Sequence, residues 1–347
     1  MKFAVGYQLP EEDEEPLVDI VRDFRDHIHE VYFPWLDMPS GRSPMSARDG
    51  AADWQAQPRL EADLRALKDM GVRLDILFNA NCYGRQSLAV SLANRVGSVV
   101  AHLLDTVGLD AVTTTSPFIA RTIQEHFPQL DVRASVNMRI GTVKGMSYLA
   151  DLFDSFYLQR EYNRDLDRIR ELKAWADAHA KGLLCLVNSG CVNFCSAQTF
   201  HDNLVAHDRE VDPAGALPGF DPHVCWGLLR NRANWPVVLQ STWIRPEDLH
   251  RYEGLFEEVK LATRVHARPR AVIDAYARGR HRGNLLDLLE PNFSRALAPY
   301  ILDSERFPDD WFERTSGCGR QCDRCDYCAK TLDRLLVDAR DAETAPL

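Results

Sequence analysis

The stretch "VRLDILFNA", residues 72–80, is a short apolar run with branched and aromatic side chains. Such a run between polar turns is typical of a buried β-strand. A helical pattern follows it in "SLAVSLANRVGSVVAHLLDTVG" at 87–108, and another strand pattern comes next in "DAVTTTSP" at 110–117. Strands that alternate with helices in this way favour parallel pairing of the strands.

This alternation of strand and helix recurs eight times along the 347 residues. The expected strands occupy residues 2–8, 30–35, 72–80, 110–117, 131–137, 155–162, 182–190 and 257–264. Eight repeats predict an α/β fold that closes into a (β/α)8 barrel of the TIM type. An open, doubly wound sheet is the alternative, but no GxGxxG motif follows the first strand to indicate dinucleotide binding.

Departures from the repeat suggest the domain organisation. A long insertion, about 190–250, follows the seventh strand, and this fold places its chemistry on loops at the carboxyl ends of barrel strands. We therefore expect a barrel at 1–283 that carries this insertion, and a cysteine-bearing C-terminal extension at 284–347. An irregular segment rich in Pro, Ser and Gly also follows the second strand and continues to about residue 55.

The composition is that of an ordinary globular protein, with 45% hydrophobic and 27% charged residues. A formal net charge of -10 argues against nucleic acid as the main partner, because phosphate binding normally needs a basic face. The basic stretch at 267–283 alternates with apolar residues at helical spacing, which indicates a solvated helix face. No apolar run approaches the roughly 20 residues that span a bilayer, and the N-terminus turns acidic before a signal-peptide core could form. We expect a cytoplasmic protein.

Nine cysteines are many for a reducing compartment, where clustered thiols point to metal or redox chemistry rather than to disulfides. The clusters are "SGCGRQCDRCDYC" at 316–328, "NSGCVNFCS" at 188–196 and "HVCWG" at 223–227. Zinc sites with four thiolates usually separate two C-x2-C pairs by a dozen or more residues. The tight spacing therefore favours [4Fe-4S] ligation over structural zinc. We expect seven metal ligands: Cys191, Cys195, Cys225, Cys318, Cys322, Cys325 and Cys328.

Two arrangements of these thiols stay open. Either one cluster joins Cys191, Cys195 and Cys225 to one tail cysteine, or two clusters exist, one with an open iron and one closed by the four tail cysteines. Because three of the seven cysteines lie in the insertion and four in the tail, we favour two clusters. The tail spacing also matches the triad of radical-SAM enzymes, but that triad normally lies near the start of a barrel. Cys185, within a strand pattern, is expected to be a buried side chain.

Several pieces of the sequence resemble one known family. They are "LFNANCYG" at 77–84, "LLCLVNSGC" at 183–191, "FHDNLVAH" at 200–207, "STWIRPEDLHRYE" at 241–253 and "VKLATR" at 259–264. On these residues the chain resembles the peptidase U32 family, over most of the barrel and most strongly from about residue 72 to 280.

The resemblance implies an iron–sulfur protein rather than a protease. Members of understood activity resemble [4Fe-4S] proteins of oxygen-independent hydroxylation, acting on ubiquinone precursors, ribosomal RNA or transfer RNA with prephenate as oxygen donor, and some are heterodimers. The commoner form of the family has a C-x6-C pair followed by two distant cysteines. Here Cys185 and Cys191 are separated by five residues, Cys195 follows at once, and the tail cysteines lie outside that pattern.

The carboxyl ends of the expected strands carry amides and cations. These suit an anionic small molecule, because arginine binds carboxylates through two parallel hydrogen bonds. Each residue could instead cap a helix or pair with one of the many carboxylates. We expect a catalytic group of Asn81, Cys82, Arg139, Arg160, Lys260 and Arg264, and a cofactor-binding group of Asn188, His201 and Asn203.

Together these features predict a U32-type [4Fe-4S] oxidoreductase that acts on a small anionic molecule, with hydroxylation as one such reaction. A homologous partner subunit or an electron donor is the expected protein partner. Three alternatives stay open: an iron–sulfur accessory or electron-transfer subunit, an RNA-modifying hydroxylase, and a peptidase. The peptidase has little local support, because the sequence holds neither HExxH nor GxSxG.

Overall fold

The computed structural model describes residues 1–11, 13–41, 55–207 and 219–342. Its centre is a closed barrel of eight parallel strands that pair in sequence order, with β8 returning to β1. The predicted α/β class and closed eight-stranded barrel are confirmed, and the open sheet is excluded. The strands are β1 Lys2–Gly6, β2 Ile28–Pro34, β3 Arg73–Phe78, β4 Ala111–Thr114, β5 Asp131–Ala134, β6 Ser155–Tyr157, β7 Gly182–Leu186 and β8 Glu258–Leu261.

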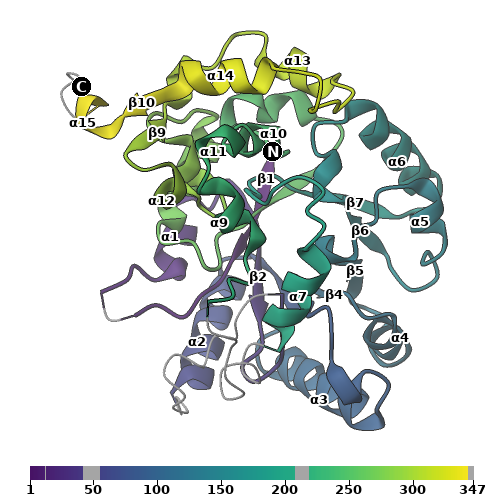
Figure 1. Ribbon diagram of the computed structural model, residues 1–347. Coiled ribbons are helices and arrows are strands. Elements are labelled where there is room, and N and C mark those ends of the chain that lie inside the picture. Colours follow the sequence, from purple (N-terminus) through teal and green to yellow (C-terminus); the bar gives the residue numbers. More distant parts are fainter. Residues whose placement is uncertain (12, 42–54, 208–218, 343–347) are drawn as a thin grey trace.

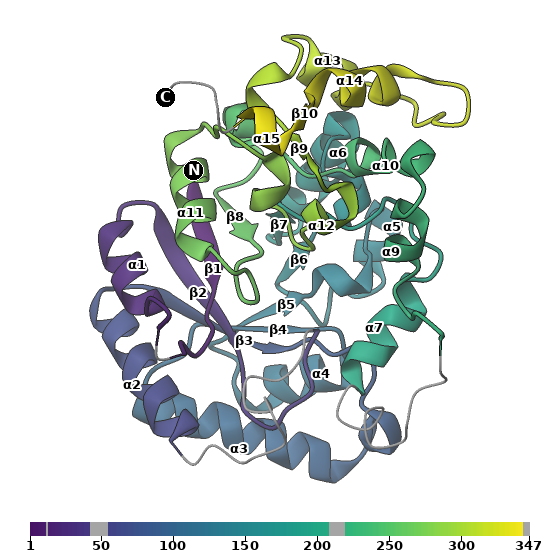
Figure 2. The same cartoon turned by 60° about the vertical axis from the view of Figure 1, so that its left-hand side comes forward.

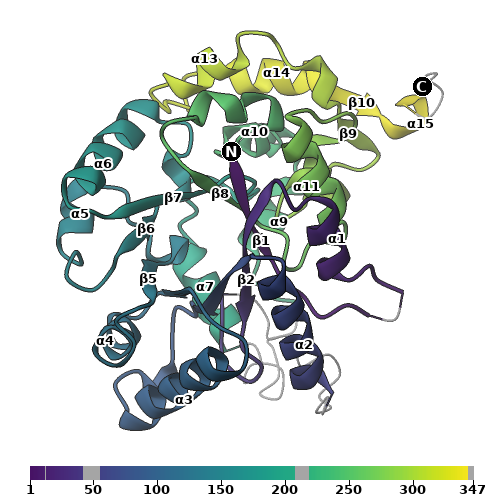
Figure 3. The same ribbon diagram turned by 180° about the vertical axis from the view of Figure 1, so that it is seen from behind.

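A helix on the outside of the barrel follows each of the strands β1–β6 and β8 (Figures 1 and 3). Apolar residues spaced three or four apart form the buried face of each long helix; in α3 they are Leu92, Val96, Val100 and Leu103. The helices are α1 Leu17–Asp23, α2 Ala56–Asp69, α3 Val90–Thr106, α4 Pro117–His126, α5 Val143–Ser147, α6 Leu166–Ala178 and α11 Pro269–Arg278.

Two helices are shorter than their patterns predict. The first pattern extends over 17–28, but α1 ends at Asp23 because the residues from Ile28 onward enter strand β2. The fifth extends over 142–152, but α5 ends at Ser147 and gives way to turns. In both places the apolar residues have helical spacing, but the backbone leaves the helix early and forms the turns that lead into the next barrel strand.

The segment between β7 and β8 carries short helices in place of one long one. Part of the predicted insertion, 208–218, and most of the irregular segment after β2, 42–54, lie outside the described residues. Figure 2 shows α7 and α9 along the same side of the barrel. The elements here are α7 Gln198–Ala206, α9 Val224–Leu229, α10 Val237–Gln240 and 3-10 turns at Arg232–Asn234 and Pro246–Tyr252.

The C-terminal segment packs along one edge of the barrel (yellow, top of Figure 1). It forms a second hydrophobic core with the insertion, in which Leu229, Trp235 and Trp243 meet Phe293 and Trp311. Insertion and extension therefore share one core beside the barrel. The elements are α12 Ser294–Leu297, α13 Trp311–Ser316, α14 Tyr327–Leu335, α15 Ala339–Ala342, 3-10 turns at Leu285–Leu288 and Ser304–Arg306, and strands β9 Tyr300–Leu302 and β10 Leu336–Asp338, which pair antiparallel.

Glycine allows the extension to approach the end of β7 closely. The Gly190 N–H donates a hydrogen bond to Glu290 O over 2.8 Å, and a Cβ atom at Gly190 would collide with the carbonyl oxygen of Pro291. A larger residue here would push the extension away from the barrel. In the part of the chain that the structure describes, no helix combines the length and the apolar character that crossing a bilayer requires.

Candidate functional site at the barrel mouth

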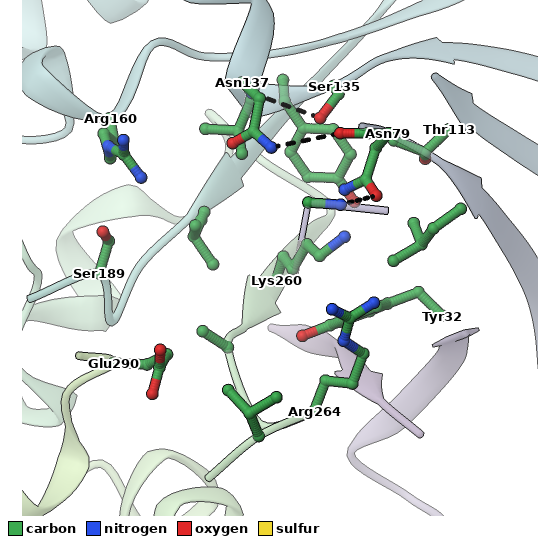
Figure 4. A pocket seen from close by; sticks show the side chains of 17 residues that line it. Tyr32, Asn79, Thr113, Ser135, Asn137, Arg160, Ser189, Lys260, Arg264 and Glu290 are labelled. Atoms are coloured by element: carbon green, nitrogen blue, oxygen red, sulfur yellow. Dashed lines mark hydrogen bonds between the residues drawn. The ribbon is translucent and has the colours of Figure 1, made fainter. Parts of the chain in front are cut away.

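A pocket opens at the carboxyl ends of the barrel strands, where this fold places its active sites. Its volume is about 80 Å³, which is room for several water molecules or one small compound. Strand ends and the loops after them supply most of the lining, and Figure 4 shows how the side chains face one another. The polar lining residues are Tyr32, Asn79, Thr113, Ser135, Asn137, Tyr157, Arg160, Ser189, Lys260, Arg264 and Glu290.

Three of the predicted catalytic residues, Arg160, Lys260 and Arg264, line this pocket together. The Arg264 guanidinium donates a hydrogen bond to the Ser40 hydroxyl over 3.0 Å, which fixes its direction. The Lys260 ammonium lies 3.6 Å from the centre of the Tyr32 ring. Three cations around so small a space create a positive field that suits an anion.

Lys260 is buried at the inner end of the pocket. Burial lowers the pKa of its ammonium to about 8, Asp75 and Glu30 act in the opposite direction, and Arg133 and Arg264 lower the pKa further. A lysine with a pKa near 8 is partly neutral at physiological pH, so it can act as a base or a nucleophile.

Asn81 and Arg139, also predicted to be catalytic, bind the insertion helix α7 rather than the pocket. Both donate hydrogen bonds to the Asp202 carboxylate, Asn81 over 3.2 Å and Arg139 over 2.8 Å. Arg139 also donates to the Thr199 hydroxyl over 3.1 Å. These bonds hold α7 beside the barrel mouth.

Asn188 spans β7, β8 and the extension. Its side-chain oxygen accepts a hydrogen bond from Ala262 N over 2.6 Å, and its NH2 donates to Ala262 O and Leu288 O over 3.2 and 2.9 Å. Backbone groups thus occupy both ends of this buried amide, which makes it a structural bridge under the mouth rather than a group directed at a cofactor.

Cys191, Cys195 and Cys225 form the first group of thiols, at the start of the insertion and on α9. Burial raises the pKa of the Cys225 thiol to about 11, and negative charge at Cys191 and Cys195 raises it further. Arg160, which lines the pocket, also lies beside Cys191. Burial works to lower the pKa of Arg160, but Cys191 and nearby carboxylates raise it above its ordinary value. The first group therefore borders the pocket.

The four tail cysteines form a second group, in which Cys318, Cys322 and Cys325 are exposed. Burial raises the pKa of the Cys328 thiol to about 11, the Arg164 guanidinium lowers it, and the other three thiols raise it. The groups are neighbours: Arg320, between the first two tail cysteines, lies 6.0 Å from the ring of Phe194, next to Cys195.

The donor sets suit a soft metal, because thiolates are the ligands of iron–sulfur centres. All nine cysteines are free thiols. Among the described residues, however, no three His, Cys, Asp or Glu side chains are gathered so that they could hold a metal ion as they stand. Metal binding would therefore have to draw the thiols together and displace their protons.

Comparison with known proteins supports the predicted resemblance. No protein-family model matches the chain. An uncharacterised protease of Methanocaldococcus jannaschii, MJ1657, is 26% identical over 275 residues, which are 78% of this chain and 79% of the relative. The structure of the U32 peptidase Mk0906 matches 75% of this chain and 91% of its own, with a TM-score of 0.53 and 16% identity, a likeness of fold. The chain is therefore similar in sequence to an archaeal protease and in fold to a U32 peptidase.

Three predicted residues remain: His201, Asn203 and Cys82. His201, on α7, lies with its ring centre 4.8 Å from that of His223, which precedes α9. His201 thus joins the two helices that flank the first thiol group. Asn203 is exposed on α7. The Cys82 sulfur accepts a hydrogen bond from Gly84 N over 3.3 Å.

Sequence reasoning missed Tyr32, Tyr157 and Glu290 in the pocket. Both tyrosines lie at inward positions of their strands, so alternation along β2 and β6 could have found them. Glu290 carries no such signal, because it reaches the mouth from the extension through the bridge between Ser189 and Glu290.

A network of buried charges lies below the pocket, inside the barrel. Arg133 of β5 donates a hydrogen bond to Glu30 of β2 over 2.6 Å, and Asp75 of β3 accepts one from Thr113 over 2.7 Å. Burial raises the pKa of Asp75 to about 6, and the negative charge of Glu30 adds to the rise. The interior of this barrel is therefore electrostatically coupled to Lys260 above it.

We expect Glu258→Gln to change how stability depends on pH. Burial, with the charge of Glu30, raises the pKa of Glu258 from 4.5 to about 8. Between these values the folded protein binds more protons than the unfolded chain, so this carboxyl lowers stability as pH rises. The variant should match the wild type near pH 4.5 and become progressively more stable than it towards pH 8. Urea unfolding across this range measures the difference, and a constant difference would contradict the expectation.

Proposed function

We propose that this protein is a U32-type enzyme that binds a small anionic molecule at the barrel mouth, beside an iron–sulfur centre held by Cys191, Cys195 and Cys225. The reaction to test first is the oxygen-independent hydroxylation that the family resemblance implies. When bound, an iron–sulfur centre with an open iron would supply a redox-active Lewis acid next to the substrate.

One observation carries this proposal: Arg160 belongs to both sites. Its guanidinium lines the pocket, and it lies close enough to Cys191 for negative charge there to raise the pKa of Arg160. An anion held by Arg160 would therefore lie close to the first thiol group. Lys260 and Arg264 would share its negative charge, and the narrow pocket would exclude most of the surrounding water.

The position of the tail thiols supports a protein partner, either an electron donor or a homologous subunit. Three of them are exposed, and Arg320 connects their segment to Phe194 beside the first group. A second iron–sulfur centre there would lie at the surface, where an electron-donor protein or a homologous subunit could approach. In this scheme the four tail cysteines would hold a redox-active centre within reach of that partner, and the pocket would bind the substrate.

The name of the archaeal relative makes peptide hydrolysis the rival function. Its best nucleophile among the predicted residues is Cys82, which precedes a short 3-10 turn at Gly84–Gln86. If the protein is a peptidase, Cys82→Ser should abolish the release of peptides from an unstructured protein substrate. If the iron–sulfur proposal holds, the same variant keeps its iron.

Metal analysis tests the proposal directly. Protein purified without oxygen should contain iron and acid-labile sulfide, with about four irons for each cubane cluster. Cys191→Ser, Cys195→Ser and Cys225→Ser should each lose the iron of the first centre, because serine replaces a thiolate with a poor ligand. Cys318→Ser is the matched control: with two clusters it should remove only the tail iron.

The outcomes separate the alternatives. Equal iron loss in Cys191→Ser and Cys318→Ser would indicate one shared cluster. Stoichiometric zinc in place of iron would favour a structural metal. A colourless, metal-free protein from oxygen-free cells would overturn the proposed centre. Arg160→Met should weaken the stabilisation of the protein by carboxylates or phosphate, because the pocket loses a cation.

A further inference from the structure

Lys260 is the one side chain of the pocket that combines a nucleophilic atom with burial among cations and aromatic rings, within the described residues. It is 8% exposed, and its Nζ lies 3.6 Å from the Tyr32 ring centre and 5.0 Å from the Tyr157 ring centre. The Lys260 nitrogen therefore lies beside two aromatic rings that line the same pocket.

Tyr157 offers a proton donor at the same place. Its side chain is 1% exposed and lines the pocket, and its hydroxyl finds no hydrogen-bond partner among the side chains and backbone that the structure describes. A buried hydroxyl without a partner is costly, which indicates that a ligand satisfies it. Burial raises the pKa of Tyr157 well above its usual value, so it stays protonated and can donate.

Arg160 and Arg264 give the pocket two further cations at separate positions around Lys260 (Figure 4). Arginine binds carboxylate or phosphate oxygens in a fixed orientation. A molecule held by one of these guanidinium groups would present its remaining atoms to the lysine. A carbonyl group adjacent to the anionic end would then lie between the Lys260 nitrogen and the Tyr157 hydroxyl.

We propose that Lys260 forms an imine with a small ketone or aldehyde that carries a carboxylate or phosphate group. The inference deepens the proposed function, since it takes the barrel mouth as the substrate site, and it adds a covalent role for this lysine. It does not depend on whether the thiols hold a metal.

The step balances without a further reactant. The neutral Lys260 amine adds to the carbonyl carbon, so that a C–N bond forms and the C=O electron pair moves to oxygen. Tyr157 donates a proton to that oxygen and regains one from the nitrogen. The hydroxyl group of this adduct then leaves as water, taking with it the second amine hydrogen, and a C=N bond remains.

The surrounding charges favour the neutral amine that the step needs. The groups that act on Lys260 come from several elements: Arg133 on β5 and Arg264 after β8 disfavour its positive charge, while Asp75 on β3 and Glu30 on β2 favour it. Burial decides the balance and brings its pKa to about 8. Trapping should therefore rise with pH up to about 8 and then level off, whereas exposed lysines become more reactive up to roughly pH 10.

Reductive trapping tests the inference. Purified full-length protein is incubated with pyruvate or with dihydroxyacetone phosphate in the presence of cyanoborohydride. Intact mass should show the gain of one reduced adduct, and peptide mapping should place it on Lys260. Lys181, which lines a separate pocket at the opposite end of the barrel, serves as the internal control lysine. The carboxylate and phosphate probes show which anion the arginines prefer.

Two variants complete the design. Lys260→Arg keeps the positive charge and should lose the adduct entirely. Tyr157→Phe keeps the ring and Lys260, so it should form the same adduct about 100-fold more slowly, as for a lost general acid. Circular dichroism checks that both variants are folded. If one variant does not fold, the pH dependence of trapping in the wild type still tests the inference.

The failure of this inference and of the proposed function can be distinguished by thermal unfolding with the same probes. If either probe raises the melting temperature but Lys260 stays unmodified, the imine is wrong and the anion site stands. If adducts appear only on other lysines, the imine is also wrong. If neither probe stabilises the protein or modifies Lys260, both the imine and the proposed anion site fail.

Discussion

Arg133→Met should destabilise the protein by about 3–5 kcal/mol, the cost of leaving a buried charge without its partner. The Arg133 guanidinium lies inside the barrel and donates hydrogen bonds to Glu30 and Asp131, each over 2.6 Å. Methionine fills the space but leaves the fully buried Glu30 carboxylate opposite an apolar side chain. Urea unfolding monitored by circular dichroism gives the change in free energy.

The control is an ion pair of the same type at the surface. Arg170 and Asp167 lie 2.9 Å apart with side chains 59% and 97% exposed, so Arg170→Met should cost less than about 1 kcal/mol. The double variant Arg133→Met, Glu30→Gln should be more stable than Arg133→Met alone, because it removes a buried charge that has lost its nearest cation. Equal losses at the buried and exposed sites would show that the barrel interior is well hydrated and that the network carries no special cost.

Trp311→Ala should cost about 3–5 kcal/mol in the second core and loosen the C-terminal extension. The Trp311 ring is 1% exposed, and its centre lies 5.9 Å from that of Trp243 and 4.9 Å from that of Phe307. The Arg164 guanidinium lies 5.2 Å from the same ring. The truncation therefore removes packing between the insertion and the extension, together with a cation–π contact. Chemical denaturation measures the loss.

Limited proteolysis shows whether that loss is local. Cleavage within residues 318–328 should become faster in Trp311→Ala, while the barrel keeps its circular dichroism spectrum. Tyr148→Ala, which removes an aromatic side chain that is 71% exposed, should stay within about 0.5 kcal/mol of the wild type and leave the tail protected. If the barrel loses its circular dichroism signal together with the protection of the tail, barrel and extension unfold as one unit.

The barrel was predictable because each strand and helix carries its own local pattern. All eight expected strands appear, and their residues overlap the observed β1–β8 throughout. Element ends were less predictable: α1 and α5 stop early because strand pairing and turns compete with helical periodicity. The irregular part of the insertion gave no period to interpret, and residues 208–218 lie outside the described chain.

Part of the candidate site was also predictable. Strand-end position placed Arg160, Lys260 and Arg264 at the mouth, since parallel strands of a barrel all end at the same face. The same reasoning could not tell that Asn81 and Arg139 bind Asp202. That partner comes from α7, and the path of an insertion is set by packing between residues distant in sequence.

Sequence by itself determined the eightfold alternation, the parallel pairing and the supply of seven clustered thiols, because periodicity and side-chain chemistry are local properties. Only the tertiary structure decided which cations share the pocket, that Arg160 contacts Cys191, and that Glu290 reaches the mouth from the extension. Those contacts depend on strand register and on a core shared by segments more than 50 residues apart, such as Trp243 and Trp311. No local pattern encodes that meeting, because it arises only when both segments bury their apolar surface against each other.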